Sequence, residues 1–194
     1  MDSDPFNIPE IHFEVSFSEA QAHYIEVKMS ITKLNQPYVD LKMPVWSPGS
    51  YLIREYAKNV ERFRSFDKTG NTISYQKISK NTWRIPTESL DQIEVIYAVY
   101  GFEVSVRTNF FDSDHAFIVP TATFFHIDGR IDSPSTVSIA LKDSWASIST
   151  GLEQIEEHKF YAPNFDVLYD TPIEAGNQDV WKFQAAGVEH ECAM

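Results

Sequence analysis

The side chains of this sequence that could bind a metal ion are not spaced as a metal site requires. Its six histidines are His12, His23, His115, His126, His158 and His190. His190-Glu191 begins like the helical zinc motif H-E-x-x-H, in which two imidazoles share one helix face. Met194 stands where the second histidine is needed, and the stretch alternates like a strand, which places neighbouring side chains on opposite faces. We therefore predict no metal site in this chain.

Nucleophilic chemistry has no better candidate. No serine lies in a G-x-S-x-G turn, and no phosphate loop, dinucleotide fingerprint or calcium loop is present. The segment Asp112-Ser-Asp-His115 gathers oxygens and an imidazole, and we interpret it as a solvated acidic turn. Cys192, the only cysteine, has no local signature of a catalytic thiol. We predict no catalytic residue here.

Arg107 is the one candidate for a buried charge. It lies in an apolar and aromatic stretch, which we predict to be extended from Val104 to Phe111. A buried guanidinium must be paired and hydrogen-bonded, and Asp112, Asp114 or Glu55 could pair with it. A salt bridge that ties strand to loop is our first interpretation, and contact with a substrate is the second.

A stiff loop is predicted within residues 43–60. Proline fixes φ, and the pair Pro48-Gly49 suits a tight turn because glycine can take positive φ after proline. Trp46 and Tyr51 flank this turn, so the loop should carry aromatic rings to a packed or ligand-facing surface. We assign to this structural loop Trp46, Pro48, Gly49, Tyr51 and Arg54.

A short amphipathic helix is expected directly after this loop. Ser50 is placed to cap it, and Glu55 would lie in its early part, where the helix dipole favours an acid. The apolar residues that recur at three- and four-residue intervals are Leu52, Ile53, Tyr56, Ala57 and Val60.

Alternation with a period of two dominates the rest of the chain and predicts strands. The predicted strands are 11–17, 24–32, 39–43, 60–66, 73–78, 82–85, 92–100, 104–111 and 137–141, with weaker ones at 145–149, 158–161, 179–183 and 188–194. Many short strands with frequent turns indicate an all-β fold, a twisted antiparallel β-sandwich. We place this domain at residues 1–172. Residues 173–194 would begin a following domain or supply the last strands of the same one.

Composition limits the function further. The net charge of −12 argues against nucleic-acid binding, which needs a basic face. No apolar run approaches the ~20 residues of a membrane-spanning helix, so we expect no membrane partner. The acidic N-terminus does not resemble a signal peptide, and one cysteine allows no internal disulfide. A cytoplasmic location is favoured, and the periplasm stays possible.

Four stretches together resemble one known family. They are Trp46-Ser-Pro-Gly-Ser-Tyr-Leu-Ile-Arg-Glu-Tyr-Ala57, Tyr97-Ala-Val-Tyr-Gly-Phe-Glu-Val-Ser-Val-Arg-Thr108 with Asp112, Ala116-Phe-Ile-Val-Pro-Thr-Ala-Thr-Phe124, and Phe165-Asp-Val-Leu-Tyr-Asp-Thr-Pro-Ile-Glu-Ala-Gly176. In order and spacing they resemble the N-terminal domain of the glycyl-aminopeptidase family of zinc metallopeptidases.

This resemblance implies a saddle-like β domain that precedes a thermolysin-like catalytic domain and a PDZ domain, which would be its partners. It implies that zinc is bound beyond residue 194, with a glutamate as general base, and that the substrate is a peptide. The residues that it suggests for the substrate cleft are Arg107, Asp112 and Thr121. Val119-Pro120-Thr121 replaces a family Asn-Gly-Thr, which could alter specificity. Acidic or carbonyl groups of this domain could also recognise the free amine of a peptide.

Two other functions fit the same residues. A free-standing β-sandwich that binds carbohydrate or a protein ligand would use exposed aromatic rings as stacking platforms. A pure scaffold would only stabilise a neighbouring domain. Most aromatic residues fall on the apolar side of the strand alternation, which favours a core role over a ligand platform.

Overall fold

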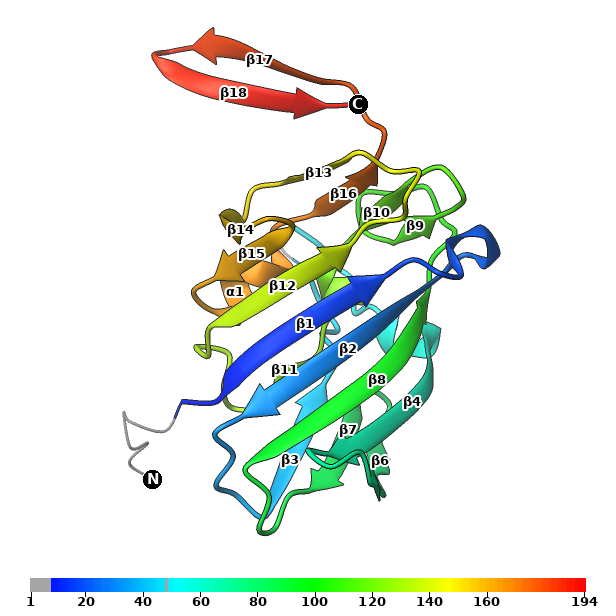
Figure 1. The fold of residues 1–194 in the computed structure, drawn as a ribbon, viewed down its shortest axis with the longest axis vertical. Coiled ribbons are helices and arrows are strands. Elements are labelled where there is room, and N and C mark those ends of the chain that lie inside the picture. The colour runs from blue at the N-terminus through cyan, green and yellow to red at the C-terminus, as the bar shows by residue number, and fades with distance from the viewer. Residues whose placement is uncertain (1–7, 48) are drawn as a thin grey trace.

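The structure of this chain is a computed structural model that describes residues 8–47 and 49–194. Its largest element is an eight-stranded sheet, the broad front layer in Figure 1. All neighbouring strands in it are antiparallel except β1 and β12, which run parallel. In spatial order the strands are β14 (Glu153–Glu156), β15 (Lys159–Ala162), β12 (Ser135–Ala140), β1 (Glu10–Ser16), β2 (Tyr24–Thr32), β8 (Gln92–Tyr100), β4 (Val60–Asp67) and β5 (Thr72–Ile73).

Two four-stranded sheets complete the body. The first runs β11 (His126–Ile127), β3 (Tyr38–Lys42), β7 (Thr82–Pro86), β6 (Gln76–Ser79) and lies behind the large sheet in Figure 1. The second runs β13 (Ser147–Thr150), β16 (Ile173–Gly176), β10 (Ala116–Ile118), β9 (Phe110–Phe111).

The last two strands form a hairpin that stands off the body. Among the described strands, β17 (Val180–Ala185) and β18 (Val188–Ala193) pair only with each other, and Figure 1 shows them at the top of the molecule. Residues 173–176, by contrast, pair with β10 and β13. The division into domains at residue 172 stays a prediction.

Helices are few and short. The α-helix α1 (Phe165–Tyr169) is capped by the side chain of Asn164, which accepts from the backbone N–H of Val167. Three 3-10 turns are η1 (Ala20–Ala22), η2 (Tyr56–Asn59) and η3 (Pro120–Ala122). In the part of the chain that the structure describes, no helix is long and apolar enough to cross a membrane.

The all-β sandwich predicted from the alternation is confirmed. Strand 92–100 has the bounds that the sequence predicts, and the strands at 11–17 and 24–32 pair as an antiparallel hairpin. In these strands every second side chain points into the core, so the apolar residues alternate with polar ones and predict the strands correctly.

Three local predictions are wrong. The strand expected over 73–78 is divided, because β5 ends at Ile73 in the large sheet and β6 begins at Gln76 in the sheet behind it. The helix expected after Tyr51 is reduced to the four-residue turn η2, and Ser50 does not cap it, since Glu55 precedes the turn. Arg54 donates its backbone N–H to the carbonyl of Val45 at 2.7 Å, which folds this stretch back as a loop instead. The strand expected over 104–111 is formed only at 110–111.

The core between the sheets is built on aromatic packing. Phe63 of β4, Trp83 of β7 and Tyr97 of β8 surround Phe125, with ring centroids 4.8 to 5.8 Å from it. Tyr97 is fully buried, and its hydroxyl donates to the carbonyl of Thr123 at 3.0 Å. Burial raises the pKa of this hydroxyl well above its ordinary value, so it stays a donor.

Replacing Tyr97 with phenylalanine tests this contact. The change keeps the ring but leaves the buried carbonyl of Thr123 without its donor, so we expect the free energy of unfolding to fall by about 1–3 kcal/mol. Urea denaturation would measure the loss. The matched control is Tyr38→Phe, at an exposed tyrosine, and an equal effect in both variants would contradict the interpretation.

Candidate functional site

The Trp46 loop is held by hydrogen bonds to Ser50. The indole Nε1 of Trp46 donates to the carbonyl of Ser50 at 2.7 Å, and the guanidinium of Arg54 donates to its hydroxyl at 3.3 Å. Gly49 takes a φ of +72°, as the turn prediction requires. Pro48 lies outside the described residues. The loop is therefore anchored from within and has a defined shape.

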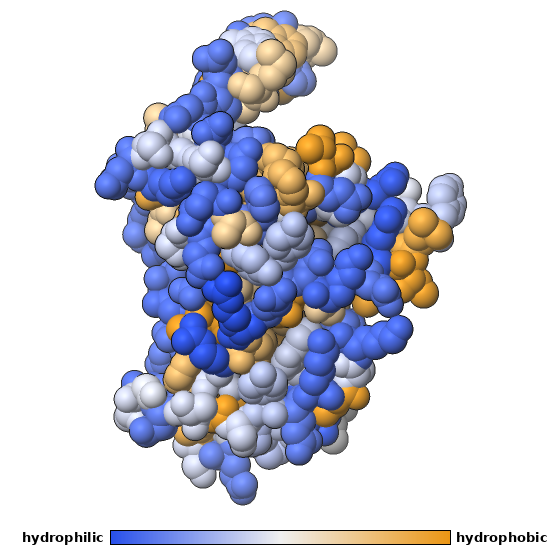
Figure 2. Space-filling view, turned by 90° about the vertical axis from the view of Figure 1, so that its right-hand side faces the viewer, coloured by the Kyte–Doolittle hydropathy of each residue, from blue (hydrophilic) through white to orange (hydrophobic). Residues whose placement is uncertain are grey.

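This anchored loop presents apolar side chains to solvent. Tyr51 is fully exposed, Ile53 is 82% exposed and Leu52 is 63% exposed. Figure 2 shows apolar atoms gathered in separate patches on a largely hydrophilic face. Exposed apolar groups that cluster on a fixed loop indicate a contact surface for another protein or a ligand.

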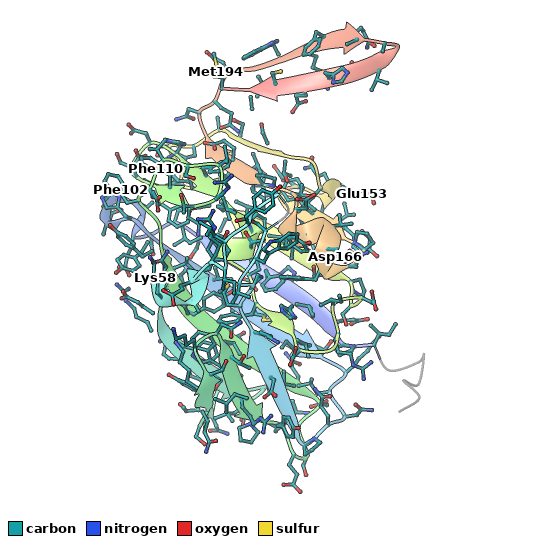
Figure 3. All side chains as sticks on the ribbon, turned by 180° about the vertical axis from the view of Figure 1, so that it is seen from behind. Lys58, Phe102, Phe110, Glu153, Asp166 and Met194 are labelled. Carbon is teal, nitrogen blue, oxygen red and sulfur yellow. The ribbon has the colours of Figure 1, made fainter. Side chains whose placement is uncertain are left out.

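A second loop, residues 102–109, also presents apolar side chains to solvent. The ring of Phe102 stacks between His23 at 3.6 Å and Phe110 at 5.2 Å, and Figure 3 shows the two phenylalanines together at one edge of the molecule. Beyond this stack, Val104 and Val106 are each more than 80% exposed.

Arg107 is not the buried arginine that the sequence predicts. It lies in a turn of this second loop and is exposed, and no ion pair joins it to Asp112, Asp114 or Glu55 within residues 8–47 and 49–194. Its apolar neighbours Val104 and Val106 point to solvent rather than to the core, so the apolar composition of this stretch was misleading. A role for Arg107 in contacting substrate stays a prediction.

Asn109 connects the second loop to η3. Its side-chain carbonyl accepts from the backbone N–H of Val119 at 2.7 Å, and its amide donates to the hydroxyl of Thr123 at 3.0 Å. Gly101 must be glycine here, because an added Cβ would lie 2.4 Å from the Cβ of Asn109. Asn109 itself is 3% exposed, so it positions the 119–123 segment without reaching solvent.

Thr121, a predicted cleft residue, is buried within η3. Its side chain is 1% exposed, and its hydroxyl has no hydrogen-bond partner among the described residues. The side chain thus does not reach the surface that the structure describes. Its part in a substrate cleft is untested.

Asp112 caps the turn that leads to β10. Its carboxylate accepts from the backbone N–H groups of Asp114 at 2.8 Å and His115 at 3.0 Å. Burial alone would raise its pKa, but these two N–H groups and the nearby imidazoles hold the pKa below its ordinary value. Asp112 therefore stays ionised and shapes the turn.

A row of side chains crosses the outward face of the second four-stranded sheet. The strand register places Phe110 opposite Phe117, Phe117 opposite Glu174, and Glu174 opposite Ser149. Residues opposite each other in a ladder share one face, whereas their neighbours Phe111, Ala116 and Ala175 are fully buried on the other. We call these four residues the outer row.

At the centre of the outer row, Glu174 meets His115. The imidazole Nδ1 of His115 lies 2.6 Å from the carboxylate Oε1 of Glu174. Burial raises the pKa of Glu174 and the charge of Asp112 adds to this, while the bond to His115 opposes it. No sequence pattern indicates this pair, because its two members are 59 positions apart.

The predicted site residues are only partly brought together. Asp112 stands beside His115 at the outer row, whereas no hydrogen bond or ion pair among the described residues joins Arg107, Asp112 and Thr121 to each other. Sequence reasoning missed Asn109 and Glu174. Asn109 lies within the motif Ser105-Val-Arg-Thr-Asn109, so its position next to a predicted site residue was the available signal.

The resemblance implies zinc in the longer protein, but the described residues of this chain offer no set of zinc ligands. No group of three or more histidine, cysteine, aspartate or glutamate side chains gathers around one point in the described parts of the chain. His115 and Glu174 form a pair without a third ligand. We therefore assign no metal-dependent reaction step to the described residues of this domain.

Sequence comparison gives the family. Residues 12–177 match the sequence model of the peptidase M61 N-terminal domain family. This chain belongs to that family. The predicted resemblance to the N-terminal domain of a metallopeptidase is thereby confirmed, and the match covers the Trp46 loop, the second loop and the outer row. A comparison with curated proteins gave no match.

Solved structures share the fold of this chain. An aminopeptidase N family protein from Idiomarina loihiensis is similar, with a TM-score of 0.86 and 27% identity over 94% of this chain and 32% of that chain. An M1 zinc metallopeptidase mutant from Deinococcus radiodurans has a TM-score of 0.50 and 10% identity, over 92% of this chain and 44% of that one. The latter shows the shared fold alone. This chain spans about a third of the length of the Idiomarina protein.

Replacing Asn109 with alanine tests how the second loop and η3 are held together. The change leaves the buried N–H of Val119 without its acceptor and removes the amide donor to the hydroxyl of Thr123, which keeps its bond to the carbonyl of Val119. We therefore expect a loss of about 2–3 kcal/mol in the free energy of unfolding. Amide hydrogen exchange should quicken first at 119–123. Asn35→Ala, in an exposed turn, is the control, and unchanged exchange in Asn109→Ala would refute the positioning role.

The raised pKa of Glu174 predicts a pH dependence. Its protonated form is favoured in the folded state, so its contribution to stability is complete below the unfolded pKa of 4.5 and is lost as pH rises through the folded value. We expect Glu174→Gln to gain in melting temperature over the parent as pH rises from 4 towards 7. Exposed Glu153→Gln is the control, and a constant difference for Glu174→Gln across this range would contradict the burial argument.

Proposed function

We propose that this M61 domain is the non-catalytic N-terminal part of a zinc-dependent aminopeptidase-like metallopeptidase. In this proposal it supports the catalytic part of the enzyme and forms one wall of its substrate cleft. Zinc and the general base would belong to polypeptide outside this chain, together with a thermolysin-like domain and a PDZ domain. The substrate would be a peptide.

The observation that carries the proposal is the presence of two anchored loops with exposed apolar side chains. The Trp46 loop presents Tyr51 and Ile53, and the second loop presents Val104 and Val106. A domain that worked alone would gain nothing from fixing such groups in water. The length of the Idiomarina protein, about three times that of this chain, supplies polypeptide that could cover them.

A free-standing carbohydrate-binding module is the weaker alternative. It needs several exposed aromatic rings in one row, whereas Trp83, Trp145 and most phenylalanines are buried. The family match, which is to a peptidase domain, adds support to the metallopeptidase proposal.

Joining this chain to the last two thirds of the Idiomarina loihiensis protein tests the docking role. The chain would replace the third of that protein that it matches, where the TM-score of 0.86 indicates that the folds superpose. We expect Ile53→Asp and Val104→Asp in this fusion to lower the melting temperature of the catalytic part and its hydrolysis of aminoacyl anilides, because a charge would be buried at the contact.

The control in the same fusion is Ile155→Asp, at an isoleucine of β14 that is also partly exposed but lies at the far edge of the large sheet. Equal activity and equal melting in all three variants would overturn the docking role. A loss of activity with unchanged melting would assign the loops to the substrate cleft rather than to the domain contact.

A further inference from the structure

The outer row is chemically divided along its length. Phe110 and Phe117 supply ring surface at one end, and Glu174 and Ser149 supply oxygen at the other. Val104 and Val106 of the second loop border the aromatic end, where they line a pocket together with the rings and His115. The apolar half is thus concave and walled on one side.

The polar half is a second hollow that shares His115, Phe117 and Glu174 with the first. Asp114, Asn177 and Gln178 line it, and the end of the β17–β18 hairpin overhangs it at Met194. The two hollows, of about 670 and 560 Å³, lie within the range of pockets that bind small ligands.

Two hydrogen-bond acceptors of the polar half have few or no donors. The oxygen Oε1 of Gln178 is buried and has no hydrogen-bond partner among residues 8–47 and 49–194, while its Nε2 donates to Ser149 at 3.2 Å. The carboxylate of Asp114 is nearby, and Glu174 has only His115 as a side-chain partner in the described residues. Lys142 also reaches this end, but its ammonium donates to the carbonyl of Ser113 at 3.1 Å.

We propose that the outer row binds a peptide segment that carries a cationic group next to an apolar side chain. The apolar side chain would pack on Phe110 and Phe117, between these rings and Val106. The ammonium or guanidinium would donate to the carboxylate of Glu174, close to the buried and unpaired oxygen of Gln178. A cation there compensates a half-buried carboxylate, which is otherwise costly to keep ionised.

This inference deepens the proposed function, since it names the peptide chemistry that one surface of the domain would accept. The outer row lies wholly within this chain, and only Val104 and Val106 at its border also belong to the proposed docking surface, so binding to the isolated chain is tested separately from docking. A failure here would leave the docking proposal intact, and a failure of docking would leave this binding site intact.

Binding is tested on the 194-residue chain by following backbone amide signals in NMR titrations. The main probe is acetyl-Leu-Lys-Leu-amide, whose only cation is a side chain, and the reversed-charge probe is acetyl-Leu-Glu-Leu-amide. We expect the lysine probe to shift the amides of Phe110, Phe117 and Glu174, and the glutamate probe to bind at least about fivefold more weakly. Equal binding of both probes would overturn the proposal. So would the absence of any shift at the outer row both with these probes and with the free-amine probe described below.

Two substitutions localise the effect. Glu174→Gln keeps the shape of the side chain and should weaken the lysine probe about fivefold while leaving the glutamate probe no weaker. Val106→Asp, at an exposed position that tolerates a charge, should weaken the apolar contact of both probes. The control is Glu153→Gln, on the remote strand β14, which should bind like the parent; loss of binding in it, or none in Glu174→Gln, refutes the assignment.

A third probe, Leu-Leu-amide with a free amino group, separates the two sources of a cation. If it binds with the same dependence on Glu174 and the lysine probe does not, the cation is a peptide N-terminus. If only the lysine probe binds, the cation is a side chain. Either result supports the site, and binding of neither removes it.

Discussion

The packing of Phe125 against rings from both layers of the sandwich is the contact on which the rest of the structure depends. Phe63, Trp83 and Tyr97 approach it from β4, β7 and β8, so one side chain joins two sheets. Aromatic rings of this size contribute much of the apolar area that a core buries. Because Phe125 is two residues beyond the 119–123 segment, the same packing helps to fix the backbone that Asn109 holds.

The loops combine polar anchors with apolar surfaces, which reverses the arrangement of the strands. Ser50 and Asn109 are buried and hydrogen-bonded, while the side chains beside them, such as Ile53 and Val104, face water. A buried polar group that loses its partner is costly, so each anchor holds its loop in one shape. The exposed apolar groups are thus kept in fixed positions, which favours recognition with little loss of conformational entropy.

The strands could be predicted from the sequence because burial on one face imposes a period of two. Strand 92–100 and the 11–17 and 24–32 hairpin are examples. The loops could not be predicted in the same way, because their apolar residues lie on the surface. The apolar residues Val104 and Val106 beside Arg107 wrongly predict a buried arginine. The pair of His115 and Glu174 could not be predicted from the sequence, because it depends on the register of β10 against β16. That register is a property of the assembled sheet.

The parallel pairing of β1 with β12 has a consequence for the order in which the chain folds during synthesis. β1, β2 and β8 form a local antiparallel unit that is complete once residue 100 has left the ribosome. The other edge of β1 finds its partner only when residues 135–140 emerge. In that interval β1 is an open edge with unpaired backbone groups, a template for wrong pairing with another nascent chain. Of the strands at the centre of the large sheet, β1 is therefore the one most exposed to misassembly on the polysome.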